Sequence, residues 1–432
     1  MRCPRKQPLS ARTLKLTLLL PTRHVGMATP DHVPEGRGFD EALNYFDGYN
    51  DQWTMQWIDN CGENGNVTDF QSPSGGGRRN PSTCSQDDQE GCIFQDDAFA
   101  ARVLDIISAH DPTTPLFFFF SPHSVHGPLQ VPQAFLNKFD FVDFMPRRRM
   151  MAMLSYLDDL MGRVVAALKA RGLWENMLFV CTGDNGGPIQ TLCPSNITND
   201  LLCDASNNYP LRGGKFGNLE GGVRANGFVA GGLLPPAVRG TRVEGFTAVE
   251  DFYSTFAALA GVDPTDHRAA AAGLPPVDGL NLWPMLSGAN LTSPRTELVL
   301  GAVLGADKTW VQGVTRADGW KLLITNATSG CIAPAWFQNA NYPNASSTPQ
   351  PGLCCGDPHS KGKGCLFNVL EDPYEMVDQS ENHPDIVEAL RARIEELQAG
   401  VYSPQRGGSE HGNAEICATA LSHGRFLAPY LP

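Results

Sequence analysis

The feature that most constrains the fold of this chain is an order of helix and then strand that occurs twice. Residues 96–110 carry apolar side chains at helical spacing, and an apolar run of strand length follows at 116–120. Residues 150–171 repeat the helical pattern, and the apolar run 177–181 comes next. Short apolar runs bounded by turn residues indicate buried strands, and helices between them are typical of right-handed crossovers. This order predicts an α/β fold with a largely parallel sheet flanked by helices.

The pattern changes near Val303. Two apolar segments within residues 310–324 flank an Ala-Asp-Gly turn, which is a hairpin signal. A final helix is predicted at 384–399. We therefore predict an α/β domain over residues 24–303 and a smaller C-terminal antiparallel α+β domain over residues 304–432.

The net charge and the cysteine content restrict the class of protein. A formal charge of −13 argues against a nucleic-acid-binding protein, which needs clustered Lys and Arg. Twelve cysteines favour a secreted protein or one in the lysosomal or endomembrane lumen. Glycosylation sequons, which favour the same compartments, begin at Asn66, Asn196, Asn290, Asn326 and Asn344.

Four of the cysteines lie close together in a stretch rich in Pro, Gly and Asn. They are Cys331, Cys354, Cys355 and Cys365, and no Cys-x-x-Cys pair with zinc-finger spacing accompanies them. We predict a loop held by disulfides, although spacing alone leaves their pairing open.

The N-terminal segment, residues 1–23, is atypical. Residues 1–30 contain Arg and Lys but no acidic residue, and the one apolar patch, 14–20, is interrupted by Lys15. The patch is far too short to span a membrane and is marginal as a signal-peptide core. We expect no membrane span and find no convincing signal peptide in this chain.

Asp184 and Asn185 follow the apolar run 177–181, at the end of a predicted buried strand. In α/β sheets, ligands bind at the carboxyl ends of the strands. A carboxylate and an amide oxygen suit Ca²⁺ or Mg²⁺, and the glycines Gly186 and Gly187 allow a close approach. Two side chains do not complete such a site.

Three further loops carry residues that could serve the same chemistry. His126 follows the run 116–120, Lys215 follows two glycines, and His24 lies near the N-terminus. Each has a plainer interpretation, because loop histidines and lysines are usually solvated, and Arg224 is expected to pair with Glu220. A divalent cation, a lysine and two histidines at one sheet edge would suit hydrolysis of a tetrahedral oxyanion ester. Residue types alone do not separate sulfate from phosphate.

At these motifs the sequence resembles the type I sulfatases, and the arylsulfatase B branch in particular. The resemblance implies an alkaline phosphatase-like fold and a Ca²⁺ cofactor, with Asp184 and Asn185 among the calcium ligands. It implies that His126 protonates the leaving alcohol, that Lys215 binds the sulfate, and that His24 deprotonates the hydrated formylglycine and expels the sulfate. The partners implied are a sulfated small molecule or glycan and formylglycine-generating enzyme. The matching stretches are residues 26–40, 124–132, 182–187, 210–224 and 366–375.

The sequence also departs from the family. None of its cysteines lies in the Cys-x-Pro-Ser-Arg motif that yields the formylglycine nucleophile, and Cys193-Pro-Ser-Asn lacks the arginine. No pair of aspartates precedes His24, and Thr22 and Arg23 replace the lysine and tryptophan of the family motif. We therefore expect an arylsulfatase-type sulfuric ester hydrolase that lacks its N-terminal part, is inactive as this chain and is prone to aggregate for want of a central strand.

Two alternatives stay open on the sequence. One is a phosphatase or phosphodiesterase of the alkaline phosphatase-like superfamily, whose members usually bind zinc through additional Asp and His ligands. The other is a non-catalytic pseudoenzyme that binds sulfated glycans.

Overall fold

The computed structural model describes most of the chain, in the ranges 15–20, 27–57, 61–62, 65–71, 80–189, 201, 203, 205–304, 309–324, 331–332, 353–354, 364–401 and 412–431. These residues form two compact units. The N-terminal unit contains the described residues of 15–175, residues 201, 203 and 205, and residues 412–431. The C-terminal unit contains the described residues of 176–401 other than those three. The domain boundary predicted near Val303 stays a prediction.

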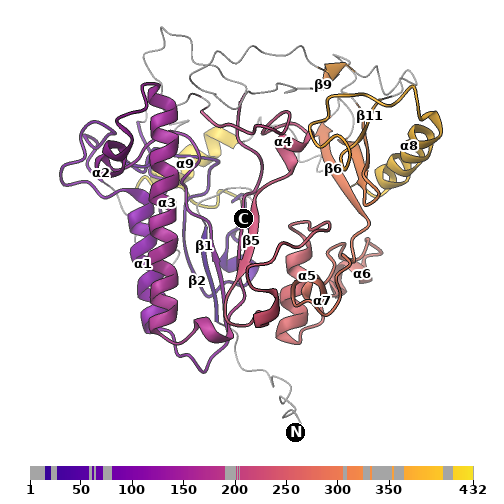
Figure 1. Ribbon diagram of the computed structural model, residues 1–432. Helices are drawn as coiled ribbons and strands as arrows, with labels where there is room; N and C mark the ends of the chain where they lie inside the picture. Colours follow the sequence, from indigo (N-terminus) through magenta and orange to yellow (C-terminus); the bar gives the residue numbers. More distant parts are fainter. Residues whose placement is uncertain are drawn as a thin grey trace. The chain divides into compact units, whose positions relative to one another are not determined.

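A three-stranded parallel sheet lies in the N-terminal unit (Figure 1). Its middle strand is β1 (Lys15–Leu20), which pairs in parallel with β2 (Glu41–Asn44) and with β3 (Leu116–Phe120). The expected lack of a central strand is therefore wrong for this sheet. The apolar patch that is marginal as a signal-peptide core has the length of a strand, and the chain uses it as one.

Two long helices accompany this sheet. Helix α1 (Gln95–Ala109) leads into β3, as predicted, and α3 (Met145–Ala170) lies beside α1 (Figure 1). Tyr156 on α3 is buried, and its hydroxyl donates to Asp97 on α1 at 2.8 Å. The shorter helices of this unit are η1 (Pro30–His32), η2 (Glu35–Arg37), α2 (Gln133–Leu136), η4 (Asn137–Phe139) and η5 (Trp174–Asn176), the last of which ends in the C-terminal unit.

The C-terminal segment of the chain packs in the N-terminal unit. Helix α9 (Gly412–Ser422) follows the helix predicted to be the last, and a disulfide joins its Cys417 to Cys61. Leu427 donates its N–H to the carbonyl of Thr68 at 3.0 Å. Apolar side chains from both ends of the sequence share one core cluster, namely Met27, Phe46, Trp57, Val67, Ile416, Ala420 and Leu427.

In the C-terminal unit, β4 (Phe179–Thr182) and β5 (Gly227–Ala230) form an antiparallel pair, with Phe179 opposite Ala230. The second helix-then-strand pattern predicted another parallel neighbour, and the structure does not confirm it. Within the described residues, β4 pairs only with β5. The helices of this unit after β4 and before the next sheet are α4 (Glu220–Val223), η7 (Pro236–Val238), α5 (Asp251–Ala260), α6 (His267–Ala271) and α7 (Trp283–Leu286).

The predicted antiparallel α+β arrangement is confirmed after residue 296. Four antiparallel strands lie in the order β11-β8-β7-β6, and α8 packs against them (Figure 1). The strands are β6 (Glu297–Leu304), β7 (Thr309–Arg316), β8 (Trp320–Leu323) and β11 (Cys365–Asn368), and the helix is α8 (Pro384–Ala399).

The predicted cysteine-rich loop is described in part. Strands β9 (Cys331–Ile332) and β10 (Leu353–Cys354) pair so that Cys331 lies opposite Cys354 in the backbone register. Cys365 is disulfide-bonded, and Cys355 lies outside the described residues. In the described part of the chain, none of the helices combines the length and the apolar character needed to cross a membrane.

Candidate functional site

A junction of glycines brings the Asp184-Asn185 turn and the Lys215 turn together within the C-terminal unit. Gly186 donates its N–H to the carbonyl of Gly222 at 2.8 Å, and Lys215 donates its N–H to the carbonyl of Gly187 at 3.2 Å. The backbones lie so close that a Cβ on Gly186 would stand 1.7 Å from the carbonyl oxygen of Gly221. Only glycine permits this approach. The structure therefore brings the Asp184-Asn185 turn and the Lys215 turn together through their backbones, and the roles of these side chains stay predictions.

Asn208 ties the two turns to each other from one side. Its side-chain oxygen accepts the N–H of Gly187 at 3.0 Å, and its Nδ2 donates to the carbonyls of Gly187 and Gly213, both at 2.9 Å. The sequence does not indicate a role for Asn208. An isolated asparagine in a loop carries no signal of such a contact.

Asp184 is exposed, and Asn185 is partly buried. One carboxylate oxygen of Asp184 accepts the N–H of Asn185 at 2.9 Å, and the amide nitrogen of Asn185 donates to the carbonyl of Gly186 at 3.0 Å. The second carboxylate oxygen and the amide oxygen have no partner among the described residues.

These two oxygens are of the kind that a hard cation prefers, but they are too few, because Ca²⁺ takes about six to eight oxygen ligands. No group of three His, Cys, Asp or Glu side chains suited to a metal ion occurs in the part of the chain that the structure describes. The donors present thus fit two ligands of a calcium site.

A buried ion network supports the Lys215 side of the junction. Lys321 on β8 is fully buried, and its Nζ lies 2.8 Å from Glu220 on α4 and 2.8 Å from Glu375. Glu375 also accepts the N–H of Glu220 at 2.6 Å, and its carbonyl accepts from Arg212 at 3.1 Å. Burial alone lowers the pKa of Lys321, but the two glutamates together raise it above its usual value. The lysine is therefore held charged between them.

This network explains two motifs that the sequence analysis linked only to a family. Glu220 and Glu375 belong to the stretches 210–224 and 366–375, and both serve structure. Arg224 lies 3.8 Å from Glu220, so the structural interpretation of that pair is confirmed.

His126 lies in the N-terminal unit, in the loop that follows β3. Its Nδ1 is 2.8 Å from the carbonyl of Gly127. Because a carbonyl only accepts, Nδ1 carries the proton, and Nε2 is the nitrogen that gains and loses one. The ring is partly buried, with the rings of Tyr49 and His123 each 6.0 Å away between centroids.

A buried carboxylate at the start of α1 fixes this loop. Asp96 accepts the backbone N–H of His123 with one oxygen and that of Ser124 with the other, each at 2.8 Å. Burial raises the pKa of Asp96, although these two hydrogen bonds oppose the change. Burial lowers the pKa of His123 to about 3, and the nearby His126 adds to the effect. His123 is thus a neutral residue with a structural role.

Buried amide side chains hold the rest of the loop. Gln130 accepts the N–H of Gln52 at 2.8 Å and donates to Asp51 at 2.7 Å. Gln86 accepts the N–H of Val131 at 2.8 Å and donates to its carbonyl at 3.0 Å.

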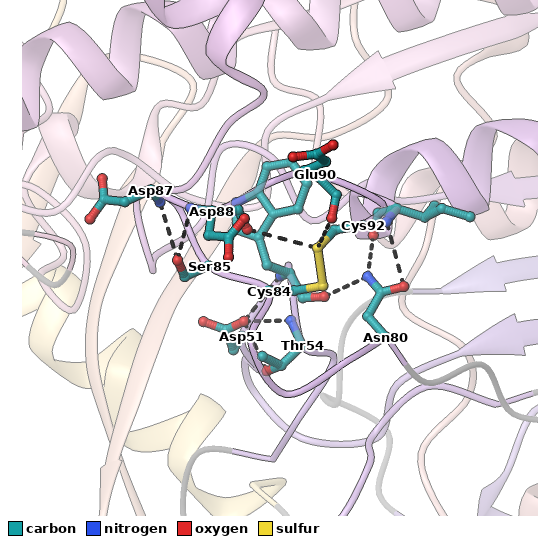
Figure 2. Close-up of a disulfide and its surroundings, with 11 residues drawn as sticks. Asp51, Thr54, Asn80, Cys84, Ser85, Asp87, Asp88, Glu90 and Cys92 are labelled. Atoms are coloured by element: carbon teal, nitrogen blue, oxygen red, sulfur yellow. Dashed lines mark hydrogen bonds between the residues drawn. A yellow bond between two sulfur atoms is a disulfide. The ribbon is translucent and has the colours of Figure 1, made fainter.

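Gln86 lies between Cys84 and Cys92 in the sequence. The disulfide between these two cysteines closes a small loop (Figure 2). Figure 2 shows Asp51 beneath this disulfide, bonded to Thr54, and Asn80 beside it. The disulfide loop therefore supports the segment that carries His126.

Two further residues bear on the predicted chemistry, and only His24 was predicted as a site residue. His24 lies outside the described residues, so its role stays a prediction. Cys181 on β4 is a free cysteine close to Asp184 in sequence, and burial raises the pKa of its thiol. A thiol held protonated is a poor nucleophile.

Comparison with known proteins places these features in a family. Residues 21–262 match the sulfatase family. Mouse arylsulfatase J is 30% identical over 400 residues, which cover 87% of this chain and 58% of the mouse protein. This chain thus spans less than two thirds of the length of that relative.

Solved structures agree at the level of the fold. The structure of Ps i-CgsB in complex with k-i-k-neocarrahexaose has a TM-score of 0.66 and 21% identity, and covers 91% of this chain and 73% of its own. That of BT4656 with its substrate D-glucosamine-2-N,6-O-disulfate has a TM-score of 0.51 and 12% identity, over 90% of this chain and 80% of its own.

These likenesses define an alkaline phosphatase-like fold. Because the family match covers more than half of the sequence, the chain belongs to the sulfatase family.

Proposed function

We propose that this chain carries the ester-binding part of an arylsulfatase-type sulfuric ester hydrolase for sulfated carbohydrates or aryl alcohols, and that as this chain it binds such esters without hydrolysing them. The glycine junction is the observation that carries the proposal. It places the exposed Asp184, Asn185 and the Lys215 turn in one loop cluster. Family membership and the sulfated sugar in the BT4656 structure support sulfate as the anion.

Each residue has a distinct part in this proposal. Lys215 would bind the sulfate through its ammonium group, and Asp184 and Asn185 would provide two oxygens to Ca²⁺. The cation, when bound, polarises the non-bridging oxygens of the ester. In a form that has the formylglycine nucleophile, His126 would give a proton from Nε2 to the leaving alcohol, and its Nδ1 contact with Gly127 suits that tautomer.

The proposed lack of turnover follows from the missing nucleophile motif. None of the twelve cysteines occurs in the Cys-x-Pro-Ser-Arg context, and Cys181 is held as a thiol. Removing an activated nucleophile costs many powers of ten in rate. We propose that formylglycine-generating enzyme is a partner of a form that has this motif. The Cys61–Cys417 and Cys84–Cys92 disulfides support secretion or a lumenal location.

The binding part is tested by calorimetric titration of inorganic sulfate and 4-nitrophenyl sulfate into the full chain, with and without Ca²⁺. We expect Lys215→Ala to weaken the affinity for both anions by about tenfold or more, since a hydrogen bond to a charged group contributes about 1.5–3 kcal/mol. Lys169→Ala, on the exposed face of α3, is the matched control and should leave both affinities unchanged. Equal losses in the two variants would refute a sulfate role for Lys215.

Turnover is tested separately. The chain is co-expressed with formylglycine-generating enzyme and assayed with 4-nitrophenyl sulfate and 4-nitrophenyl phosphate in the presence of Ca²⁺. We expect no hydrolysis of either ester. Robust hydrolysis of the sulfate would overturn the non-hydrolysing part of the proposal, whereas hydrolysis of the phosphate alone would favour a phosphatase.

A further inference from the structure

The turn that carries Lys215 also contains an unusual phenylalanine. Gly217 donates its N–H to the carbonyl of Gly214 at 3.0 Å, so Lys215 and Phe216 occupy the two central positions of a turn. Phe216 has a φ of 71°. Glycine or asparagine is usual at such a position, because a Cβ crowds the backbone there. A bulky residue in this conformation costs stability and points to a use for its side chain.

Packing does not offset that cost. The ring of Phe216 is 78% exposed and has no ring contact with another aromatic residue in the described part of the chain. By contrast, the exposed Phe228 on β5 stacks on Phe179, with 6.2 Å between centroids. The neighbour of the Phe216 ring is the Nζ of Lys215, which lies 5.4 Å from the ring centroid.

We propose that Phe216 is a specificity-determining residue, whose ring forms a platform for the ring of the alcohol that bears the sulfate. This inference rests on the proposed role of Lys215. An ester held at Nζ has its alcohol within reach of the aromatic ring, because the two groups are only 5.4 Å apart. A phenyl ring has no hydrogen-bonding group, so it selects a flat apolar face rather than a pattern of hydroxyls. An aryl ring and the C–H face of a pyranose both offer such a face.

The test compares the affinity for sulfate esters whose alcohol contains a ring with the affinity for inorganic sulfate, which contains none. Inorganic sulfate, 4-nitrophenyl sulfate and galactose 6-sulfate are titrated into the full chain with Ca²⁺. The variants are Phe216→Gly and Phe216→Asn, which suit the backbone conformation, and Phe216→Trp, which keeps a ring. Phe141→Ala is the matched control, since Phe141 is 71% exposed in the N-terminal unit.

We expect Phe216→Gly and Phe216→Asn to bind at least one ring ester about three- to tenfold more weakly, as the loss of an aromatic contact predicts. Their affinity for inorganic sulfate should stay unchanged, and Phe216→Trp should retain the ester affinity. The thermal midpoint of Phe216→Gly should rise, because glycine adopts a positive φ without strain. A loss confined to galactose 6-sulfate assigns the platform to a pyranose, and a loss confined to 4-nitrophenyl sulfate assigns it to an aryl ring.

Two other outcomes are distinguishable. If the unaltered chain binds inorganic sulfate and the Phe216 variants keep full ester affinity, the platform is refuted and the proposed function stands. If the unaltered chain binds neither sulfate nor ester, the proposed function fails and this inference fails with it.

Discussion

At the scale of single residues, the candidate site depends on the absence of side chains. Gly186 and Gly222 let two loops meet at hydrogen-bond distance, and Asn208 closes the contact from the side. The candidate residues Asp184 and Lys215 belong to turns that this contact holds. Small residues thus determine where the charged ones lie.

Gly186→Ala should therefore disrupt the junction. The new Cβ would meet the backbone oxygen of Gly221 at 1.7 Å, and backbone atoms cannot move aside as a flexible side chain can. We expect a loss of about 2–4 kcal/mol in the free energy of unfolding, measured by urea denaturation, together with weaker sulfate binding. Gly162→Ala in α3 is the control. Its Cβ would meet nothing within 4 Å, so it should stabilise the helix by about 0.5–1 kcal/mol.

His123 should make stability depend on pH. Its pKa falls from an ordinary 6.5 to about 3 in the folded chain, so the unfolded chain takes up a proton first as the pH is lowered. The stability that the neutral ring contributes to the folded chain is fully present above pH 6.5 and is lost as the pH falls towards about 3. The expected slope for one proton is about 1.4 kcal/mol per pH unit.

Urea unfolding of the unaltered chain and of His123→Asn over this pH range measures that contribution. The variant should show the shallower dependence on pH, although it is less stable at neutral pH. Identical slopes for the unaltered chain and His123→Asn would exclude the proposed linkage.

At the scale of elements, a buried charge joins the loop cluster to the antiparallel sheet. Lys321 projects from β8 to Glu220 at the start of α4 and to Glu375 beyond β11. Segments distant in sequence therefore fix the helix that precedes Arg224. A buried charge that loses its partner is costly, whereas an exposed ion pair contributes little.

Lys321→Met should destabilise the C-terminal unit by about 3–5 kcal/mol, because Glu220 and Glu375 then lose the buried positive charge that lies between them. Differential scanning calorimetry and urea unfolding can measure the loss. The control is Arg316→Met on the neighbouring β7, which removes an exposed pair with Asp318 and should cost about 0–1 kcal/mol. Adding Glu220→Gln and Glu375→Gln to Lys321→Met should recover part of the stability. No recovery would mean that the cost comes from lost packing rather than from charge.

At the scale of the whole molecule, one disulfide closes a very long loop. Cys61 and Cys417 are 356 residues apart and join α9 to the first part of the N-terminal unit, whereas Cys84 and Cys92 are 8 residues apart. A cross-link that closes a longer loop removes more entropy from the unfolded chain.

Replacing both cysteines of a pair by alanine should therefore lower the free energy of unfolding by a different amount for each pair. We expect about 5 kcal/mol for the Cys61 and Cys417 pair and about 2.5 kcal/mol for the Cys84 and Cys92 pair. Urea unfolding under non-reducing conditions, followed by circular dichroism, measures both. Equal losses would show that loop length does not govern the effect in this molecule.

Much of the secondary structure follows from local sequence pattern. The helices at 95–109, 145–170 and 384–399, the strand 116–120 and the hairpin after residue 308 lie where apolar periodicity and turn residues predict them. Pairing between strands was harder to predict. The apolar patch at 14–20 has no periodicity that separates a signal core from a strand, and its described residues, 15–20, form the middle strand of a parallel sheet. The partner of β4 is β5, which follows the segment 206–226. The sequence of that segment contains no pattern that predicts which strand pairs with β4 or in which register.

The features of the candidate site can likewise be separated into those that follow from local sequence and those that depend on the tertiary structure. The sequence by itself determined the chemical types and their place at the ends of elements, namely Asp184 and Asn185 after a strand, Lys215 after two glycines and His126 after the phenylalanine run. Only the tertiary structure decided that Gly186 meets Gly222, that Lys321 neutralises two glutamates and that Phe216 stands exposed beside Lys215. The physical reason is the separation in sequence over which each kind of interaction acts. Periodicity and turn chemistry act over a few neighbouring residues, whereas close backbone approach and buried charge pairs depend on segments that only folding brings together.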